Sequence, residues 1–190
     1  MAATSTMLPL GSTAAEFDLP DPAGNRHRLQ DADGKPGLLV MFICNHCPYV
    51  KHVNERLAAL TAEWMDRGLA VFGIASNDVD AYPDDAPPRM AAVAAEVGYP
   101  FPYLYDEDQS VARTYRAACT PDFFLFDGDR KLVYRGQFDD SRPGGPKVVT
   151  GADLAAAVDA VLAGGTVAAE QRPSMGCSIK WKPGSEPDWS

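Results

Sequence analysis

A run of six apolar residues, 38–43, followed at once by Cys44-Asn45-His46-Cys47, is the feature that most constrains how this chain folds. Such a run without a polar residue is typical of a β-strand that is buried on both faces of a sheet. After Pro48, apolar residues recur three and four positions apart, at Val50, Val53, Leu57, Leu60 and Trp64. This spacing predicts one face of an amphipathic helix. The two cysteines are therefore predicted where a buried strand passes into a helix, within the first helical turn.

This placement of the two cysteines favours redox chemistry. The first turn of a helix has free N–H groups and the positive end of the helix dipole, and both stabilise a thiolate. A Cys-x-x-Cys so placed in an α/β pattern is typical of a redox-active dithiol. The pair could also be half of a zinc site, but the chain has no second Cys-x-x-Cys to complete it. We therefore predict a dithiol that needs no metal and no cofactor.

Composition narrows the class of partner. The net charge of -9 and the pI near 4.7 argue against nucleic acid and against an anionic membrane surface. No stretch approaches the ~20 apolar residues of a membrane helix, and residues 1–10 contain neither Lys nor Arg nor the apolar core of a signal peptide. We therefore expect a cytoplasmic protein, a monomer or small homo-oligomer, acting on protein or small-molecule thiols and disulfides.

The first half of the chain predicts an α/β fold. Residues 1–31 form two short segments around a Pro22 to Asn25 turn, which predicts a hairpin extension before the first core strand. Residues 69–75 predict a second buried strand, so that strand, helix and strand form a right-handed βαβ unit. A helical insertion around residues 90–97, a short strand at 103–105 and a short helix at 109–115 follow.

The second half predicts a hairpin, a last helix and a tail. Residues 123–126 and 132–134 flank Asp127-Gly128-Asp129-Arg130, a strong hairpin signal. Thr150 to Asp153 has the form of a capping box, with Asp in place of the usual Glu, and predicts the start of a helix. Residues 173–190 are polar and rich in Pro and Gly, which predicts an irregular tail. Residues 1–190 are thus expected to form one domain, with a central mixed sheet flanked by helices.

Four stretches of the chain resemble the thioredoxin superfamily, and within it the peroxiredoxin-like branch of AhpC/TSA-type redoxins. They are residues 42–50, 119–124, 134–140 and 173–177. The resemblance implies a thioredoxin-like fold and a redox site. It also implies that Pro121 is cis and lies beside the dithiol, where Thr120 and Pro121 present their backbone to an extended substrate.

The predicted reaction is thiol–disulfide exchange, in which Cys44 attacks a substrate disulfide and Cys47 resolves the mixed disulfide. His46 is expected to stabilise the thiolate, as a cation or a hydrogen-bond donor, and so to make the couple more oxidising than thioredoxin's. Cys119 is either a third redox partner or a small buried hydrophobe. Cys177 is either a second resolving thiol or a free surface cysteine.

Two alternative functions remain open from the sequence. In a peroxiredoxin the peroxidatic cysteine would be Cys47, but the accompanying proline, threonine and arginine positions hold Val40, Cys44 and Pro121. The hydrogen-bond donors that polarise a peroxide are therefore lost. The other alternative is a soft-metal module for zinc or copper, built from Cys44, Cys47 and either His46 or Cys119. The buried aspartate of thioredoxins falls on Leu38, so any general base must come from elsewhere.

Overall fold

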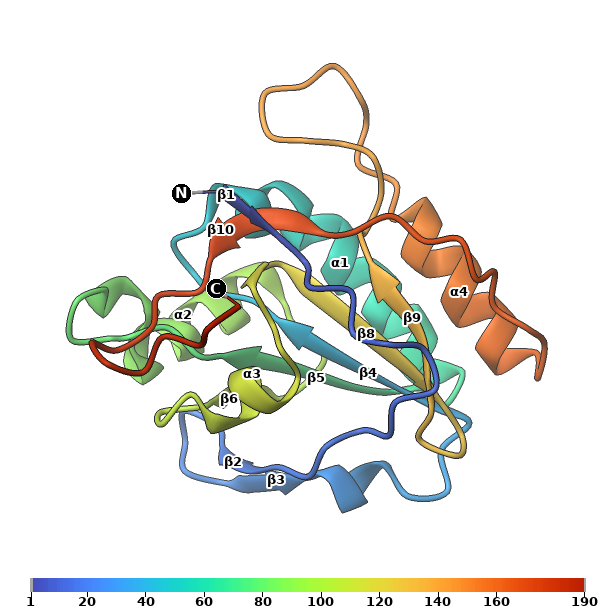
Figure 1. Cartoon of the computed structure of the whole chain (residues 1–190), viewed down its shortest axis with the longest axis horizontal. Helices are drawn as coiled ribbons and strands as arrows, with labels where there is room; N and C mark the ends of the chain where they lie inside the picture. The colour runs from blue at the N-terminus through green and yellow to red at the C-terminus, as the bar shows by residue number, and fades with distance from the viewer. Residues whose placement is uncertain (1, 190) are drawn as a thin grey trace.

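The centre of the molecule is a five-stranded mixed sheet with the strand order β6-β5-β4-β8-β9 (Figure 1). The computed structural model describes residues 2–189. The strands are β4 (Gly37–Phe42), β5 (Ala70–Ala75), β6 (Tyr103–Tyr105), β8 (Asp122–Asp127) and β9 (Leu132–Gly136). β4, β5 and β6 run parallel, whereas β8 and β9 pair antiparallel. The predicted α/β class with a mixed sheet is confirmed.

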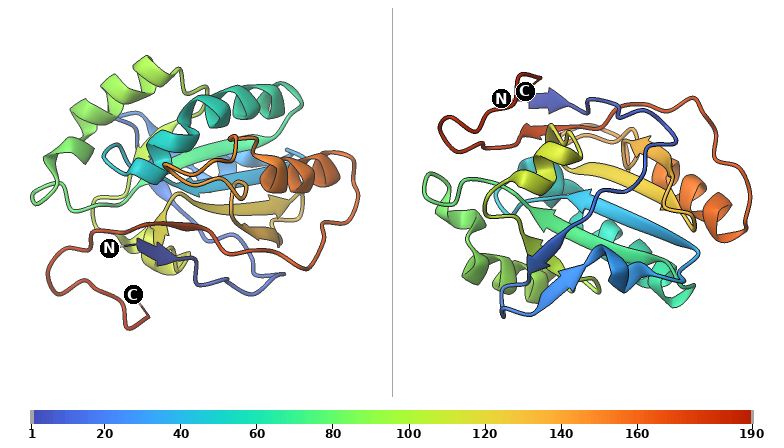
Figure 2. Two further views of the ribbon diagram at one scale, coloured as in Figure 1. Left: turned by 90° about the horizontal axis from the view of Figure 1, so that it is seen from above. Right: turned by 60° about the horizontal axis from the view of Figure 1, so that its bottom comes forward.

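Both faces of this sheet are covered (Figure 2). One face carries three helices: α1 (Pro48–Asp66), α2 (Pro87–Val97) and α4 (Ala152–Leu162). The other face carries α3 (Ser110–Thr114), the 3-10 helix η1 (Leu29–Ala32) and the hairpin of β2 (Asp18–Pro20) and β3 (Arg26–Arg28). The helical insertion consists of the 3-10 helix η2 (Pro83–Asp85) and α2. The N-terminal hairpin and the insertion are therefore present as predicted.

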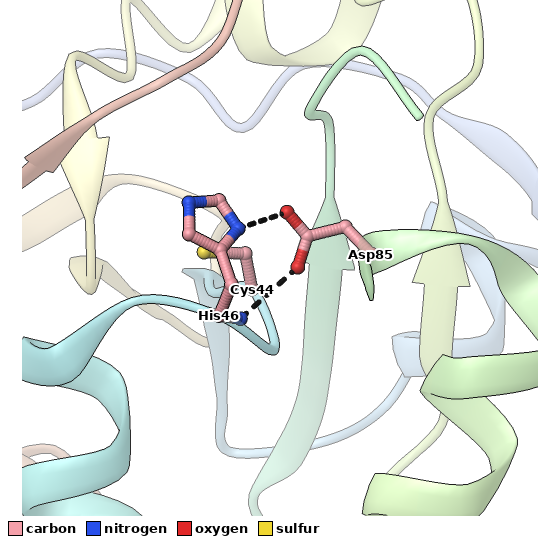
Figure 3. A group of neighbouring side chains, drawn as sticks. All are labelled: Cys44, His46 and Asp85. Carbon is pink, nitrogen blue, oxygen red and sulfur yellow. Dashed lines mark hydrogen bonds and ion pairs between the residues drawn. The ribbon is translucent and has the colours of Figure 1, made fainter. Parts of the chain in front are cut away.

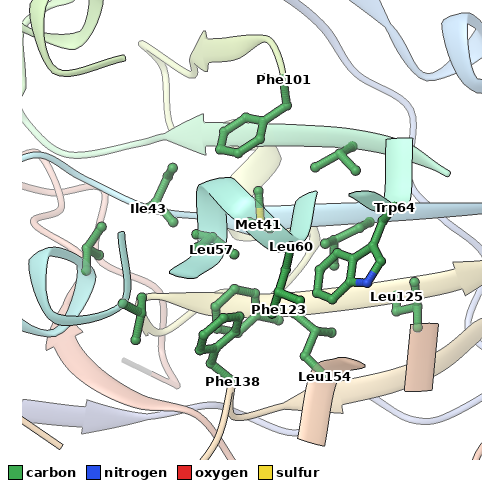
Figure 4. Packing of buried hydrophobic residues seen from close by; sticks show 14 of the residues in the cluster. Met41, Ile43, Leu57, Leu60, Trp64, Phe101, Phe123, Leu125, Phe138 and Leu154 are labelled. Carbon is green, nitrogen blue, oxygen red and sulfur yellow. The ribbon is translucent and has the colours of Figure 1, made fainter. Parts of the chain in front are cut away.

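Alternation along β4 divides the core into two apolar clusters, because successive side chains of a strand project to opposite faces. Leu39 and Met41 belong to the cluster beneath α1, and Leu38, Val40 and Phe42 belong to the other. Figure 4 shows the first cluster, which also contains Leu57, Leu60 and Trp64 of α1. Burial on both faces explains why β4 contains no polar residue.

A second, three-stranded sheet lies beside Cys44 and Cys47 and has the order β1-β10-β7 (Figure 1). Its strands are β1 (Ala2–Thr4), β10 (Met175–Ser178) and β7 (Cys119–Thr120), all antiparallel. The prediction of an irregular tail over residues 173–190 is therefore wrong at 175–178. This segment becomes a strand because it lies between two backbone edges from distant parts of the chain.

Two predicted helix starts are also corrected. Helix α1 begins at Pro48, with Cys47 as its N-cap, so both cysteines precede the first helical turn; proline is favoured at the first helical position because its missing N–H is not needed there. At α4 the N-cap is Gly151, and no capping box forms. Instead Asp139 accepts hydrogen bonds from the backbone N–H groups of Thr150 and Gly151.

Within residues 2–189, the helices include none with both the length and the apolar character needed to cross a bilayer.

Candidate active site

The two cysteines lie at the carboxyl end of β4, where the chain turns into α1, and both are buried. Cys44 is 1% exposed and Cys47 is 0% exposed. Cys44 is in the loop after β4, and Cys47 is the N-cap residue of α1. The strand and the helix thus bring the two sulfurs together, close enough that each thiol shifts the pKa of the other.

Thr120 contacts both sulfurs from the opposite side of the site. Its hydroxyl oxygen lies 3.3 Å from Cys44 Sγ, and its carbonyl oxygen lies 3.1 Å from Cys47 Sγ. The Thr120–Pro121 peptide bond is cis, as the resemblance implies. The structure therefore places Cys44, Cys47, Thr120 and Pro121 in one cluster, as the sequence predicts. Which sulfur attacks a substrate remains a prediction.

The environment of the two cysteines shifts their pKa values in opposite directions. The hydrogen bond from Cys44 is the largest cause that lowers the pKa of Cys47, to about 4, and donors on Cys177 and Thr120 and the N–H of Val50 add to it against the effect of burial. Donation to Cys47 raises the pKa of Cys44, and burial and the negative charge of Asp85 raise it further. Of the two thiols, Cys47 therefore loses its proton more readily, and when protonated it donates a hydrogen bond to the carbonyl oxygen of Thr120.

His46 is fixed next to Cys44 by a buried aspartate (Figure 3). His46 Nδ1 lies 2.6 Å from Asp85 Oδ2, and the imidazole ring stacks on Tyr82. Asp85 Oδ1 accepts hydrogen bonds from the backbone N–H groups of Asn45 and His46, at 2.8 and 3.2 Å. The structure thus places His46 beside Cys44, while its role stays a prediction, and Asp85 is an acidic residue that sequence analysis did not identify.

Cys44, His46 and Asp85 are also the residues that could hold a metal ion. Their ligand atoms lie within 4.8 Å of one another, and a thiolate, an imidazole and a carboxylate suit zinc. However, both Asp85 oxygens and His46 Nδ1 already have hydrogen-bond partners, including Asn77 Nδ2 at 2.8 Å from Asp85 Oδ2. Metal binding would have to break the His46–Asp85 contact.

The other two cysteines lie on neighbouring strands and differ in environment. Cys119 is fully buried in β7, and burial raises its pKa well above the usual range. Cys177 is only partly buried, in β10, and its thiol helps to lower the pKa of Cys47. Sequence analysis left two roles open for each of them, and the structure separates a sealed thiol from one that packs against the pair.

Sequence analysis missed the polar side chains that hold the loop from Cys44 to Cys47. Asn45 donates to the carbonyl of Asp84 and accepts from the Tyr103 hydroxyl at 3.1 Å. Asp85 and Asn77 come from the polar, proline-rich segment after β5. One signal was available: Asn77 follows the carboxyl end of a parallel strand next to β4, and such ends meet at one edge of a sheet.

Comparison with known proteins identifies the family. The family model described as AhpC/TSA matches residues 10–135, most of the chain. The chain belongs to the AhpC/TSA family. It is 26% identical, over 69% of its length and 72% of the relative's, to a protein named thiol-disulfide oxidoreductase ResA of Geobacillus kaustophilus.

Solved structures place this AhpC/TSA member in the thioredoxin-like fold. The crystal structure of an uncharacterized conserved protein from Geobacillus kaustophilus superposes with a TM-score of 0.94, is 53% identical, and covers 96% of this chain and 97% of its own. The thioredoxin domain of a thiol-disulfide oxidoreductase from Bacteroides vulgatus superposes with a TM-score of 0.57 at 21% identity, covering 67% and 88%. The fold and the peroxiredoxin-like family predicted from sequence are confirmed.

Proposed function

We propose that this protein is a thiol–disulfide oxidoreductase in which Cys44 is the nucleophile and Cys47 the resolving cysteine. The observation that carries the proposal is the pair of buried sulfurs that both contact Thr120, beside Pro121. The name of the ResA relative supports the same reaction class. The substrates would be disulfides or thiols of proteins or small molecules.

The proposed cycle begins with a proton transfer between the two sulfurs. When a proton moves from Cys44 to Cys47, Cys44 becomes the thiolate and attacks a substrate disulfide. A mixed disulfide forms, and the other substrate sulfur leaves as a thiolate. After losing its proton, Cys47 attacks Cys44 Sγ, which releases the second substrate thiol. The substrate disulfide gains two electrons, and the Cys44–Cys47 dithiol becomes a disulfide.

The His46–Asp85 pair is the candidate proton carrier for this cycle. The imidazole lies within 4.8 Å of Cys44 Sγ and is oriented by the hydrogen bond to Asp85. An imidazole held in this way can accept the proton that one sulfur loses and return it to a leaving thiolate. The His46–Asp85 pair thus supplies the general base that Leu38, at the position of the buried aspartate of thioredoxins, cannot provide.

The first test is the Cys44→Ser variant, assayed for reduction of a protein disulfide with a small dithiol as electron donor. We expect the rate to fall to the background of the donor alone, because a hydroxyl cannot replace a thiolate as nucleophile. Cys119→Ser is the matched control, since the Cys119 sulfur is sealed within β7 and should leave the rate unchanged. Full activity in Cys44→Ser would overturn the assignment.

A thiol peroxidase is the second candidate, because the pKa of Cys47 is lowered and the family is AhpC/TSA. This function predicts that peroxide converts Cys47 to a sulfenic acid, which Cys44→Ser would preserve for trapping with a dimedone-type reagent. We expect only slow labelling, since Cys47 is 0% exposed and Cys44 and Pro121 replace the residues that would bind peroxide. Rapid labelling would reverse the order of the two candidates.

A further inference from the structure

Strand β10 is held against the cis-proline segment more tightly than an ordinary strand pair. A Cβ atom on Gly176 would collide with the Thr120 carbonyl oxygen and would lie 2.6 Å from the carbonyl carbon. Only glycine therefore fits at this position. On its other edge β10 pairs with β1, with Ala3 opposite Gly176. These contacts fix the position of the next residue, Cys177.

The register of β10 directs Cys177 toward the active-site sulfurs. Cys177 lies directly opposite Thr120 in the antiparallel pair, and side chains of directly opposed residues project to the same face. The Thr120 side chain contacts Cys44 Sγ on that face. Cys177 packs against the apolar cluster that contains Cys44 and Cys47, and its thiol lies near enough to Cys47 to lower the pKa of that cysteine.

Cys119 lacks this orientation although it is close in the sheet. It precedes Thr120 in β7 and is opposed by Ser178, so its side chain projects to the other face. Its sulfur lies 3.6 Å from the carbonyl oxygen of Pro121, and its charge interactions include one with Asp122. The two additional cysteines are therefore distinguished by strand register alone.

We propose that Cys177 is a third redox-active cysteine, which exchanges with the Cys44–Cys47 disulfide to form a Cys47–Cys177 disulfide. This inference rests on the proposed function for its first disulfide. The Cys177 thiol loses its proton, and its sulfur attacks Cys47 Sγ. The Cys47–Cys177 bond forms, the Cys44–Cys47 bond breaks, and Cys44 leaves as a thiolate that takes up a proton. One disulfide and one thiol are present before and after, so the step needs no further oxidant.

The different exposure of the three cysteines suggests what this exchange step is for. Cys44 and Cys47 are almost completely buried, whereas Cys177 is partly exposed. Lys180, three residues further along the chain, lowers the pKa of Cys177 against the effects of burial and of the Cys47 contact. Exchange would thus move a disulfide from the sealed pair to a sulfur that a large protein substrate can reach. We infer that the substrate that reacts with the Cys47–Cys177 disulfide is a folded protein that carries a surface dithiol.

The experiment is peptide mapping under non-reducing conditions of the full chain and its Cys44→Ser, Cys177→Ser and Cys119→Ser variants, each equilibrated with oxidised glutathione and then alkylated. In Cys44→Ser we expect a crosslinked peptide that joins Cys47 to Cys177. This peptide should be lost in Cys177→Ser and kept in Cys119→Ser. In the wild type we expect both the Cys44–Cys47 and the Cys47–Cys177 peptides.

The outcomes separate this inference from the proposed function. If Cys44→Ser carries glutathione on Cys47 without the crosslink, while the wild type forms Cys44–Cys47, the role of Cys177 is overturned and the proposed function stands. A wild type that forms only Cys47–Cys177 supports the redox activity of Cys177 and overturns the Cys44–Cys47 couple. Circular dichroism of each variant ensures that a lost crosslink is not a lost fold.

Discussion

The two sides of the cysteine pair are built in different ways. The acidic arm, which comprises Asn45, His46, Asn77, Asp85 and Tyr103, is a set of polar side chains bonded to one another from the segments after β4 and β5 and from β6. The strand arm comprises Thr120, Asp122, Gly176 and Cys177 and is assembled by backbone pairing of β7 with β10 and of β8 with β4. The acidic arm therefore sets the charge next to Cys44, and the strand arm sets the position of the sulfurs.

Each arm contains an aspartate that is 0% exposed, and the two differ in their partners. Asp85 accepts hydrogen bonds on both oxygens, from Asn45, His46 and Asn77. Asp122 accepts from the N–H of Ala118, but its Oδ1 has no partner among the described residues. Burial raises the pKa of Asp122 to about 7. A buried carboxyl is thus well tolerated where side-chain donors surround it and costly where they do not.

The largest expected effect comes from Asp122→Asn, which removes that cost. Because burial raises the pKa of Asp122 from 3.8 to about 7, the folded protein loses stability as the pH rises from about 4 to about 7. The loss is about 4 kcal/mol at most. We expect the Asn variant to lack this slope. Urea unfolding of the reduced protein across this pH range tests it, and parallel curves for the two proteins would contradict it.

Gly176→Ala should disturb the packing of β10 against β7 in the strand arm without changing a reactive side chain. The added Cβ collides with the Thr120 carbonyl, and overpacking of this kind costs about 1–3 kcal/mol. We expect a lower urea midpoint and less Cys47–Cys177 crosslink in the Cys44→Ser background. Gly164→Ala is a partial control, since a Cβ there meets no atom within 4 Å, although its φ of +67° adds backbone strain. An unchanged crosslink yield would show that β10 does not position Cys177.

Asp85→Asn should change the redox midpoint of the cysteine pair, because it removes a negative charge from the acidic arm. The carboxylate raises the pKa of Cys44, so its removal stabilises the reduced, ionised form and makes the couple more oxidising. We expect a shift of about 30 mV, a tenfold change in the exchange equilibrium. Redox titration in glutathione buffers measures it. Asp84→Asn removes a neighbouring exposed charge and should shift the midpoint less; equal shifts would exclude a specific role for Asp85.

Tyr103→Phe should have the smallest effect, because it removes one hydrogen bond from the acidic arm. The Tyr103 hydroxyl donates to Asn45 Oδ1 at 3.1 Å, and both residues are buried. Loss of such a bond costs about 1 kcal/mol. We expect a small fall in the urea midpoint with an unchanged β-sheet signal. No fall would mean that water replaces the hydroxyl at Asn45.

The central elements could be predicted because local patterns and burial agree there. The apolar run before Cys44 has no polar residue, since β4 is buried on both faces, and the helical spacing from Val50 to Trp64 matches the buried face of α1. The nearness of Cys44, Cys47 and Pro121 followed from motif resemblance. The polar segment between Asn77 and Pro88 gave no such pattern, and for this reason Asp85 was missed.

The amino-acid sequence by itself determined the mixed α/β sheet, the dithiol at the end of its central strand and the family, because periodicity and short motifs are local properties of the chain. Only the tertiary structure decided that Asp85 orients His46, that residues 175–178 form a strand, and that Cys177 rather than Cys119 faces the pair. These features depend on contacts between residues 39 or more positions apart. Such contacts are set by how strands and loops pack, and they leave no periodic trace in the chain.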